Sequence, residues 1–316
     1  MPRAHAYNYK LDWILSFVSV ARNGGFSAGA KALYRSQPRV STHVAELEHA
    51  LGTALFDRSV HPAALTPEGR ALLPHAETIL RQLDVFTEAT ADGPDLRGEV
   101  RIGMYPSAAA YLYPQIVRRL TADHPGVTLL LREGPSLDLE QSLRHGRIDL
   151  AVRPVLPLVN DDQLEHTPLW DEPLVAITPP DHPLAAGASV ELRHLANVPL
   201  VSIGETADGN SRQFETNVAF AQAGLIPSVA YQTNQPQTLV SLVRSGLGVG
   251  VTNALAVATA NRDGVVVVPI ADSPLERRVG LWWRTGQPES MAIAVVRSVI
   301  TSLAQPQWPW AVRHDR

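Results

Sequence analysis

The sequence predicts a multidomain protein of the α plus α/β class: a helical N-terminal domain, a long linking helix and a C-terminal domain of two α/β parts. Apolar residues recur at three- and four-residue steps from residue 11 to residue 86, and strand and helix patterns alternate after that. The chain is 316 residues long, 45% hydrophobic and 18% charged, which is the composition of a globular protein with two or three cores.

Three helices are expected at the start of the chain. The first carries an apolar stripe and stops at a glycine pair, with Leu11, Ile14, Leu15, Val18 and Ala21 before Gly24 and Gly25. Ser27 is placed to cap the second, which ends near Tyr34 and Arg35. Ser36 is placed to cap the third, which ends at Gly52.

The second and third helices are joined by a tight turn, so residues 26–45 are predicted to form a helix-turn-helix. The third helix has an apolar side of Val40, Val44, Leu47 and Leu51, which leaves a polar side of the kind that enters a DNA major groove. Residues 54–56 and 64–66 are short strand patterns around a turn and predict a wing. The predicted domain spans residues 1–68.

A long helix follows, at residues 69–93. Its apolar residues alternate at four- and three-residue steps and form a heptad seam of Leu72, Ala76, Ile79, Leu83 and Phe86. Such a seam favours pairing with a second copy of the chain, and a helix packed on its own domain is the alternative. Asp92, Gly93 and Pro94 indicate a linker.

From residue 98 to about 305, strand and helix patterns alternate, which predicts parallel sheets with helices on their faces. Two such series indicate a first subdomain of residues 98–168 and 275–305, a second of residues 169–274, and a tail of residues 306–316. In the second series, strands are expected near residues 174–178, 200–203, 229–232 and 249–252. A small-molecule cleft is expected at the carboxyl ends of the strands.

Composition narrows the function. The 316 residues contain no cysteine, which excludes disulfides, thiolate zinc sites, cysteine nucleophiles and thiol redox switches within them. Residues 1–70 carry a charge of +3 and the remainder −7, as expected for a domain that approaches DNA while the rest does not. No apolar run resembles a membrane span or a secretory signal, so we expect a cytoplasmic protein without membrane contact.

The N-terminal residues resemble, in order and spacing, the DNA-binding signature of LysR-type transcriptional regulators. The matching segments are Phe26-Ser27, Ala30 to Leu33, Ser36-Gln37-Pro38, Val40-Ser41, Leu47-Glu48, Leu51-Gly52, Leu55-Phe56, Arg58 and Leu65 to Gly69. Further matches are Arg101-Ile102-Gly103, Gly146 to Asp149, Asp181 to Ala185 and Val243 to Gly250. Gly29 departs from the alanine usual in the family, which weakens the second helix by up to about 1 kcal/mol.

The resemblance implies a winged helix-turn-helix, a dimerisation helix and a clamshell like that of periplasmic binding proteins. It implies double-stranded DNA with an interrupted inverted repeat, a small-molecule effector, a second chain copy in a homodimer or homotetramer, and RNA polymerase as partners. The residues expected to contact DNA are polar or basic ones of the third helix and the wing: Ser36, Gln37, Pro38, Arg39, Ser41, Thr42, His43, Arg58 and His61.

The expected effector residues end strands or begin helices on both sides of the cleft. They are Tyr105, Ser107, Ser136, Arg153, Ser202, Ile203, Thr233, Asn234, Thr252 and Asn253. Hydroxyls beside helix N-termini and the basic Arg153 suit an anion, so we expect a small organic acid, with Tyr105 and Tyr111 suited to an aromatic one. No other cofactor, metal or catalytic residue is predicted.

Two other functions remain open at this point. A solute-binding or enzymatic α/β protein with an N-terminal helical cap would use the clamshell alone, although no nucleophile elbow or phosphate-binding loop is present. A regulator that acts constitutively would bind DNA and no effector. The sequence distinguishes neither activation from repression nor a dimer from a tetramer.

Overall fold

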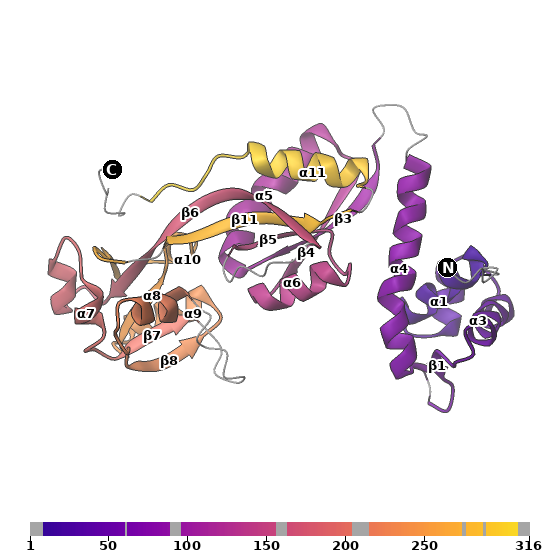
Figure 1. Ribbon diagram of the computed structural model, residues 1–316, viewed down its shortest axis with the longest axis horizontal. Helices are drawn as coiled ribbons and strands as arrows, with labels where there is room; N and C mark the ends of the chain where they lie inside the picture. The colour runs from indigo at the N-terminus through magenta and orange to yellow at the C-terminus, as the bar shows by residue number, and fades with distance from the viewer. Residues whose placement is uncertain are drawn as a thin grey trace, which may run out of the picture. The chain divides into compact units, whose positions relative to one another are not determined.

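The computed structural model describes residues 9–60, 62–88, 96–155, 163–203, 215–273, 276–286 and 289–308. The chain divides into two compact units, an N-terminal unit up to Pro94 and a C-terminal unit that holds most of the remainder (Figure 1). The predicted linker at Asp92, Gly93 and Pro94 lies outside the described residues.

The N-terminal unit contains four helices and a small hairpin among its described residues. Their bounds are α1 Leu11–Arg22, α2 Phe26–Ala32, α3 Gln37–Leu51, β1 Phe56–Asp57, β2 Ala64–Leu65 and α4 Pro67–Glu88. The apolar stripes of α1 and α3 meet in one core built around Phe17, Val40 and Val44, which are fully buried. The predicted helix-turn-helix and wing hairpin are therefore confirmed.

Caps and close contacts explain where these helices lie. The predicted cap at Ser27 is wrong, because α2 begins at Phe26 and its N-cap is Gly25, two residues before the predicted cap. Ser36 does occupy the N-cap position of α3, although its hydroxyl makes no capping hydrogen bond. Gly29 has a packing reason: a Cβ there would lie 2.8 Å from the Val20 backbone on α1. The Ser19 hydroxyl donates to the Gly29 carbonyl at 2.9 Å, so glycine allows the two helices to touch.

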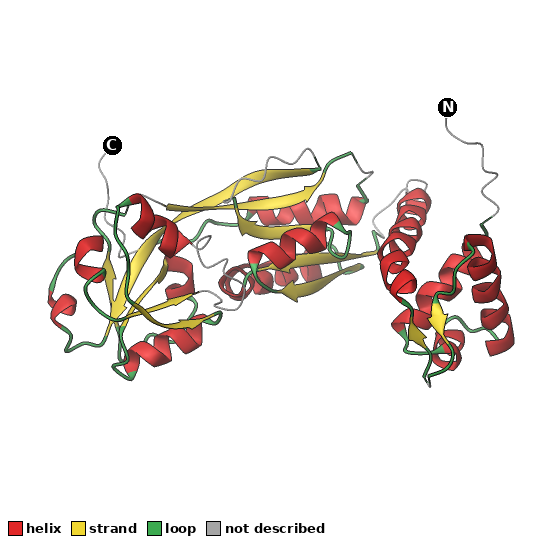
Figure 2. Ribbon diagram, turned by 60° about the horizontal axis from the view of Figure 1, so that its bottom comes forward, coloured by secondary structure: helices red, strands yellow, loops and turns green. Residues whose placement is uncertain are grey.

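The C-terminal unit is built on strands that hydrogen-bond in the order β4-β3-β5-β11-β6-β9-β7-β8, with β10 also paired to β6. Helices lie on both sides of these strands (Figure 2). The first part, subdomain I, contains β3 Gly98–Met104, α5 Pro106–Asp123, β4 Val127–Glu133, α6 Ser136–Arg144, β5 Leu150–Pro154, β11 Glu276–Arg284 and α11 Met291–Ser302.

The second part, subdomain II, lies between β6 and β11 in the chain. It contains η1 Pro183–Ala186, α7 Leu192–Leu195, β7 Leu200–Ile203, α8 Glu215–Gln222, β8 Val229–Thr233, α9 Pro236–Arg244, β9 Val249–Asn253, α10 Ala254–Ala258 and β10 Val266–Pro269. Each subdomain has its own apolar core on its part of the sheet.

One long strand, β6 Leu164–Thr178, runs from subdomain I into subdomain II, and the chain returns to subdomain I between β10 and β11. Its first ten residues pair with β11, and its last residues pair with β9 and β10. The sequence predicted only residues 174–178 as strand, because Glu165 and His166 interrupt the apolar pattern further back. The predicted parallel pairing is confirmed for β3, β4 and β5 and for β7, β8 and β9, whereas the pairings of β6, β10 and β11 are antiparallel.

The segment after α11 runs back beside β6 (Figure 1). Trp308, half-buried, packs against the core of subdomain I and against the cluster under α9 and α10 in subdomain II. Its indole Nε1 donates to the Asp171 carbonyl on β6 at 3.1 Å, and the Tyr111 hydroxyl donates to the Ala304 carbonyl. This segment therefore contacts both subdomains.

Candidate functional site

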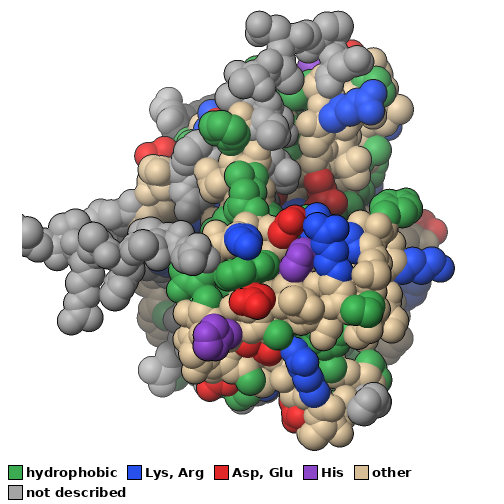
Figure 3. Space-filling view, turned by 90° about the vertical axis from the view of Figure 1, so that its right-hand side faces the viewer, with side chains coloured by type: hydrophobic (Ala, Val, Ile, Leu, Met, Phe, Trp, Pro, Cys, Tyr) green, Lys and Arg blue, Asp and Glu red, His purple; other side chains and the backbone are tan. Residues whose placement is uncertain are grey.

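The outer side of α3 presents side chains that are exposed to solvent and do not pack in the core of the domain. Ser36, Gln37, Pro38, Arg39 and Thr42 are exposed, in the first two turns of the helix. Ser41 is half-buried. Basic and acidic side chains are interspersed on the surface of this unit in Figure 3 rather than gathered into one block, which agrees with its modest charge.

His43 is turned partly towards α1. Its Nδ1 lies 2.9 Å from the Oγ of Ser16, a hydroxyl that is completely buried. Burial lowers the pKa of His43, the Asp12 carboxylate opposes this shift, and the Arg35 and Arg39 charges add to it. His43 thus connects the two helices, and the sequence pattern alone did not reveal that contact.

The base of the wing is fixed by a carboxylate of α3. One oxygen of Glu48 accepts hydrogen bonds from the Leu55 and Phe56 amides at 2.8 and 3.1 Å. The other oxygen accepts from Arg58 at 3.1 Å, and the Arg58 guanidinium lies over the Phe26 ring. Arg58 remains 48% exposed, so its charge is accessible, whereas His61 lies outside the described residues.

The heptad seam of α4 is divided. Ala76 is buried in the N-terminal core and Leu72 packs against it, so this part of the seam packs on its own unit, as the alternative prediction had it. Ile79 and Phe86 further along are 44% and 73% exposed, and Leu83 is half-buried. The prediction that the whole seam pairs with a second copy is therefore wrong. The apolar side chains that remain accessible to a partner lie towards the C-terminal end of the helix.

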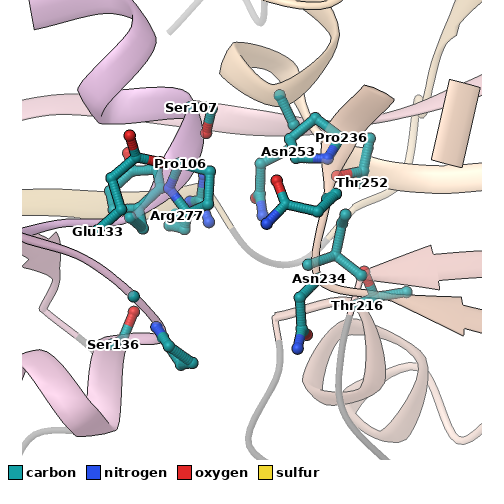
Figure 4. A pocket seen from close by; sticks show the side chains of 16 residues that line it. Pro106, Ser107, Glu133, Ser136, Thr216, Asn234, Pro236, Thr252, Asn253 and Arg277 are labelled. Atoms are coloured by element: carbon teal, nitrogen blue, oxygen red, sulfur yellow. The ribbon is translucent and has the colours of Figure 1, made fainter. Parts of the chain in front are cut away.

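A cavity of about 250 Å³ opens between subdomains I and II. Its walls come from both sides, as Figure 4 shows. The lining residues are Tyr105, Pro106, Ser107, Glu133, Gly134, Pro135, Ser136 and Arg277 of subdomain I and Ile203, Thr216, Asn234, Gln235, Pro236, Thr252, Asn253 and Ala256 of subdomain II.

Helix N-termini and unpaired polar atoms face this cavity. Its lining includes the first residues of α5, α6 and α9, namely Pro106, Ser136 and Pro236. The two prolines carry no N–H, but the other first-turn amides of these helices have no partner within the helix and carry partial positive charge. Thr252 and Asn253 are 2% and 5% exposed. Neither Thr252 Oγ1 nor Asn253 Oδ1 has a hydrogen-bond partner among the residues that the structure describes. Buried polar atoms of this kind require partners.

An ion-pair cluster forms one side of the cavity. Glu172 of β6 is fully buried and accepts from the Tyr105 hydroxyl at 3.1 Å, from Arg277 Nε at 2.7 Å and from the Leu255 amide at 3.0 Å. The Arg277 guanidinium also stacks over the Tyr105 ring at 4.6 Å. The cluster connects Tyr105, the N-cap residue of α5, and Arg277 of β11 with α10 of subdomain II through Glu172 on β6.

Seven of the ten residues predicted to bind an effector line the cavity, and three do not. Arg153 is 1% exposed: it pairs with Glu140 of α6 at 2.6 Å and stacks over Trp282, and burial lowers its pKa. Ser202 donates to the Ile203 carbonyl, and Thr233 accepts from the Gln235 amide. Tyr111 does not line the cavity either, since it packs against Trp170.

Two charged residues of the cavity were missed by the sequence analysis. Arg277 and Glu133 are the ones that line it, and Glu172 supports Arg277 from beneath. In the sequence, Arg277 is followed by a second arginine, Arg278, and nothing distinguishes the two. Only the antiparallel pairing of β6 with β11, which sets Arg277 opposite Glu172, brings its side chain to the cavity. Glu172 stands between Asp171 and Pro173 in the sequence, so no pattern of a buried strand marks it.

Within the described residues, no group of three or more His, Cys, Asp or Glu is arranged to hold a metal ion. In the same part of the chain, no helix has the length and apolar character needed to cross a membrane.

Comparison with known families identifies both units. Residues 11–70 match the description "Bacterial regulatory helix-turn-helix protein, lysR family", and residues 94–305 match "LysR substrate binding domain". The chain belongs to the LysR family. The N-terminal unit is accordingly a DNA-binding domain, and the C-terminal unit is an effector-binding domain of a transcriptional regulator. The N-terminal helices are therefore a DNA-binding domain and not an incidental cap on the α/β unit.

Relatives with this organisation are regulators. The chain is 32% identical over 304 residues to a "Probable hydrogen peroxide-inducible genes activator" of Mycobacterium avium, which covers 95% of this chain and 96% of that protein. It is 30% identical over 274 residues to the "DNA-binding transcriptional dual regulator OxyR" of Escherichia coli, covering 86% and 88%. A solved structure of a full-length OxyR variant of Pseudomonas aeruginosa shares 27% identity with a TM-score of 0.73, covering 94% and 99%.

Proposed function

We propose that this LysR-family regulator responds to a small organic acid that binds reversibly, without covalent chemistry, in the cavity between subdomains I and II. Three helix N-termini and the guanidinium of Arg277 favour an anion there, and the volume limits it to a small molecule. Glu172 already neutralises Arg277, so the helix termini provide most of the attraction.

The observation that carries the proposal is the pair of unpartnered polar atoms on Thr252 and Asn253. A hydroxyl can donate to a carboxylate, and a carboxamide presents either its oxygen or, when rotated, its nitrogen. Both side chains lie in one wall of the cavity, opposite Pro106 and Ser107 (Figure 4). A bound carboxylate with hydrogen-bonding substituents would satisfy both atoms.

Reaction of peroxide with a cysteine is not a response available to these 316 residues. Two of the relatives are named for hydrogen peroxide or OxyR, and the solved full-length OxyR is a variant in which aspartate replaces a cysteine. This chain has no cysteine at all. We therefore propose that its effector differs from the hydrogen peroxide in the relatives' names.

The proposed response is a change in the balance between open and closed arrangements of the two subdomains about β6 and β11. Pairing of chains through Ile79 and Phe86 on α4 would connect this change to two DNA-binding domains on an interrupted inverted repeat. The protein would act at the chromosome in the cytoplasm, contact RNA polymerase there, and need no enzymatic activity or cofactor.

Calorimetric titration of the purified full chain tests the effector class. The panel contains benzoate, salicylate and succinate, each beside its neutral amide. We expect at least one acid to bind and its amide to bind at least tenfold more weakly. Thr252→Val and Asn253→Ala should each weaken that acid about tenfold, the effect of losing a hydrogen bond to a charged group.

The matched control is Ser202→Ala. It removes a hydroxyl from the end of the neighbouring strand β7 without touching the cavity lining, so it should leave the affinity unchanged. Equal binding of acids and amides would overturn the anionic class. A panel that never binds, together with DNA affinity unaffected by any metabolite tested, would favour a constitutive regulator.

The pairing proposal has its own test. Phe86→Ser should raise the dimer dissociation constant in sedimentation equilibrium without lowering the melting temperature, because the side chain is exposed in the single chain. Ala76→Glu places a charge in the N-terminal core and should unfold that domain. Unchanged self-association of Phe86→Ser would show that copies meet elsewhere.

A further inference from the structure

Tyr34 lies in the turn between α2 and α3 and contributes nothing visible to the fold. It is 98% exposed, a larger exposed fraction than that of any other large hydrophobic side chain in the part of the chain that is described. A ring in this state buries no apolar area, so its hydrophobic contribution to stability is close to zero. Some other role must account for an aromatic side chain here.

The backbone at Tyr34 makes this choice of residue more costly. Its φ is +53°, and it is the one non-glycine residue with a positive φ among the described residues. The Tyr34 amide donates to the Lys31 carbonyl at 3.1 Å and the Arg35 amide to the Ala30 carbonyl at 3.0 Å. These two bonds form the Schellman arrangement that ends a helix, in which glycine is the usual residue because it alone avoids the Cβ clash.

Two other helices of the same domain, α1 and α3, show the usual solution. Gly24, at φ +73°, follows the end of α1, and Gly52, at φ +70°, follows the end of α3. The chain therefore uses glycine at both comparable turns and a strained, solvent-exposed tyrosine at the third. Conformational strain retained without a folding benefit points to a functional contact.

The turn adjoins the DNA-facing end of α3. Tyr34 stands two residues before Ser36, the N-cap, and Gln37, Pro38 and Arg39 of the first turn are exposed. Lys31, three residues earlier, is exposed too. When the N-terminal end of such a helix enters the major groove, the residues leading into it lie at the rim of the groove, beside the phosphates.

We propose that Tyr34 is a DNA-contacting residue, whose hydroxyl donates a hydrogen bond to a phosphate oxygen at the edge of the half-site. Its ring then covers the adjoining deoxyribose. Tyrosine hydroxyls are established donors to DNA phosphates, and the left-handed backbone sets the direction in which this ring projects. The proposal goes beyond the predicted contacts of α3 and the wing, and it rests on the DNA-binding role of the domain.

Three variants of the full chain test the proposal. The DNA probe is the fragment of sheared genomic DNA that the wild-type protein retains most strongly. Tyr34→Gly relieves the backbone strain and removes the contact, so it should melt roughly 2–4 °C higher while binding this fragment at least tenfold more weakly. Tyr34→Phe keeps the ring and should bind roughly three- to tenfold more weakly. Tyr231→Phe, which changes a half-exposed tyrosine of β8, should match the wild type.

The salt dependence gives a readout that a loss of folding would not produce. Tyr34 is uncharged, so Tyr34→Phe should leave the slope of log affinity against log salt unchanged, whereas loss of a cationic phosphate contact lowers the slope by about 0.9. In ethylation interference, one phosphate in each half-site whose ethylation weakens binding of the wild type should no longer do so for Tyr34→Phe. Wild-type affinity in both Tyr34→Gly and Tyr34→Phe would overturn the proposal.

Discussion

The predicted DNA-binding face of α3 and the proposed effector cavity are assembled in opposite ways. The face comes from one helix, and Gln37, Arg39 and Thr42 point outwards because the opposite stripe of α3 fills a core. The cavity collects side chains from residue 105 to residue 277, most of them at several strand-to-helix junctions that lie far apart in the sequence. Local periodicity therefore decides the first site, and long-range strand pairing decides the second.

This difference has an energetic side. Side chains on the α3 face are exposed and can change with little effect on folding, so substitutions there should alter recognition alone. In the cavity, Ser107, Thr216, Thr252 and Asn253 are buried, and Tyr105 and Arg277 belong to the cluster around Glu172 that links the two subdomains. Substitutions there should alter both folding and response, and the following predictions test that distinction.

The largest effect is expected at Glu172. Glu172→Ala removes the acceptor of the Tyr105 hydroxyl, the Arg277 guanidinium and the Leu255 amide in a fully buried place. Breaking a buried pair in this way should lower the free energy of unfolding by about 3–5 kcal/mol, measured by urea denaturation of the full chain. Glu46→Ala, an exposed acid on α3, should change it by less than about 0.5 kcal/mol. Equal effects of both variants would refute the distinction.

A second test concerns the contact between α1 and α2. Gly29→Ala should destabilise the DNA-binding domain by about 1–3 kcal/mol, because the new Cβ would meet the Val20 backbone at 2.8 Å. Ala32→Gly, on the exposed side of the same helix, should also destabilise it, by at most about 1 kcal/mol through helix propensity. A more stable Gly29→Ala, seen as a higher melting temperature, would show that propensity governs both positions.

Recognition without a folding effect is expected at Arg39. Arg39→Ala should reduce affinity for the enriched DNA fragment about tenfold, within the range of about 1–3 kcal/mol for a specific base contact, and leave the melting temperature unchanged. Thr252→Val should leave affinity for that fragment unchanged when no effector is present. Fluorescence anisotropy with labelled duplex measures both, and a lowered melting temperature for Arg39→Ala would contradict an exposed, fold-neutral face.

The smallest effect is a pH dependence at His43. Burial lowers its folded pKa below the ordinary value of 6.5, so the folded domain binds fewer protons than the unfolded chain. Its contribution to stability is present above about pH 6.5 and is lost as the pH falls below that value. Thermal melts between about pH 8 and pH 5 should show a steeper decline for the wild type than for His43→Gln. Parallel curves would exclude His43 as the source.

The same contrast between local and long-range contacts decides which parts of the structure can be predicted from the sequence. The helix-turn-helix and the wing could be predicted because their apolar spacings are local, and so could most strands of the C-terminal unit. Arg153 was misplaced because its strand is buried on both faces, and nothing in the sequence shows that Glu140 lies above it. Arg277 was missed because its role depends on pairing with a strand about one hundred residues away.

Trp308 has a practical consequence for anyone who prepares fragments of this protein. The LysR substrate-binding description ends at residue 305, and a recombinant effector-binding domain cut there would lack the indole. Apolar surface of both cores, together with the Asp171 carbonyl, would then be open to water. Such a fragment should be prone to aggregation. Its ligand affinities would be those of a domain that lacks the C-terminal segment in contact with both subdomains.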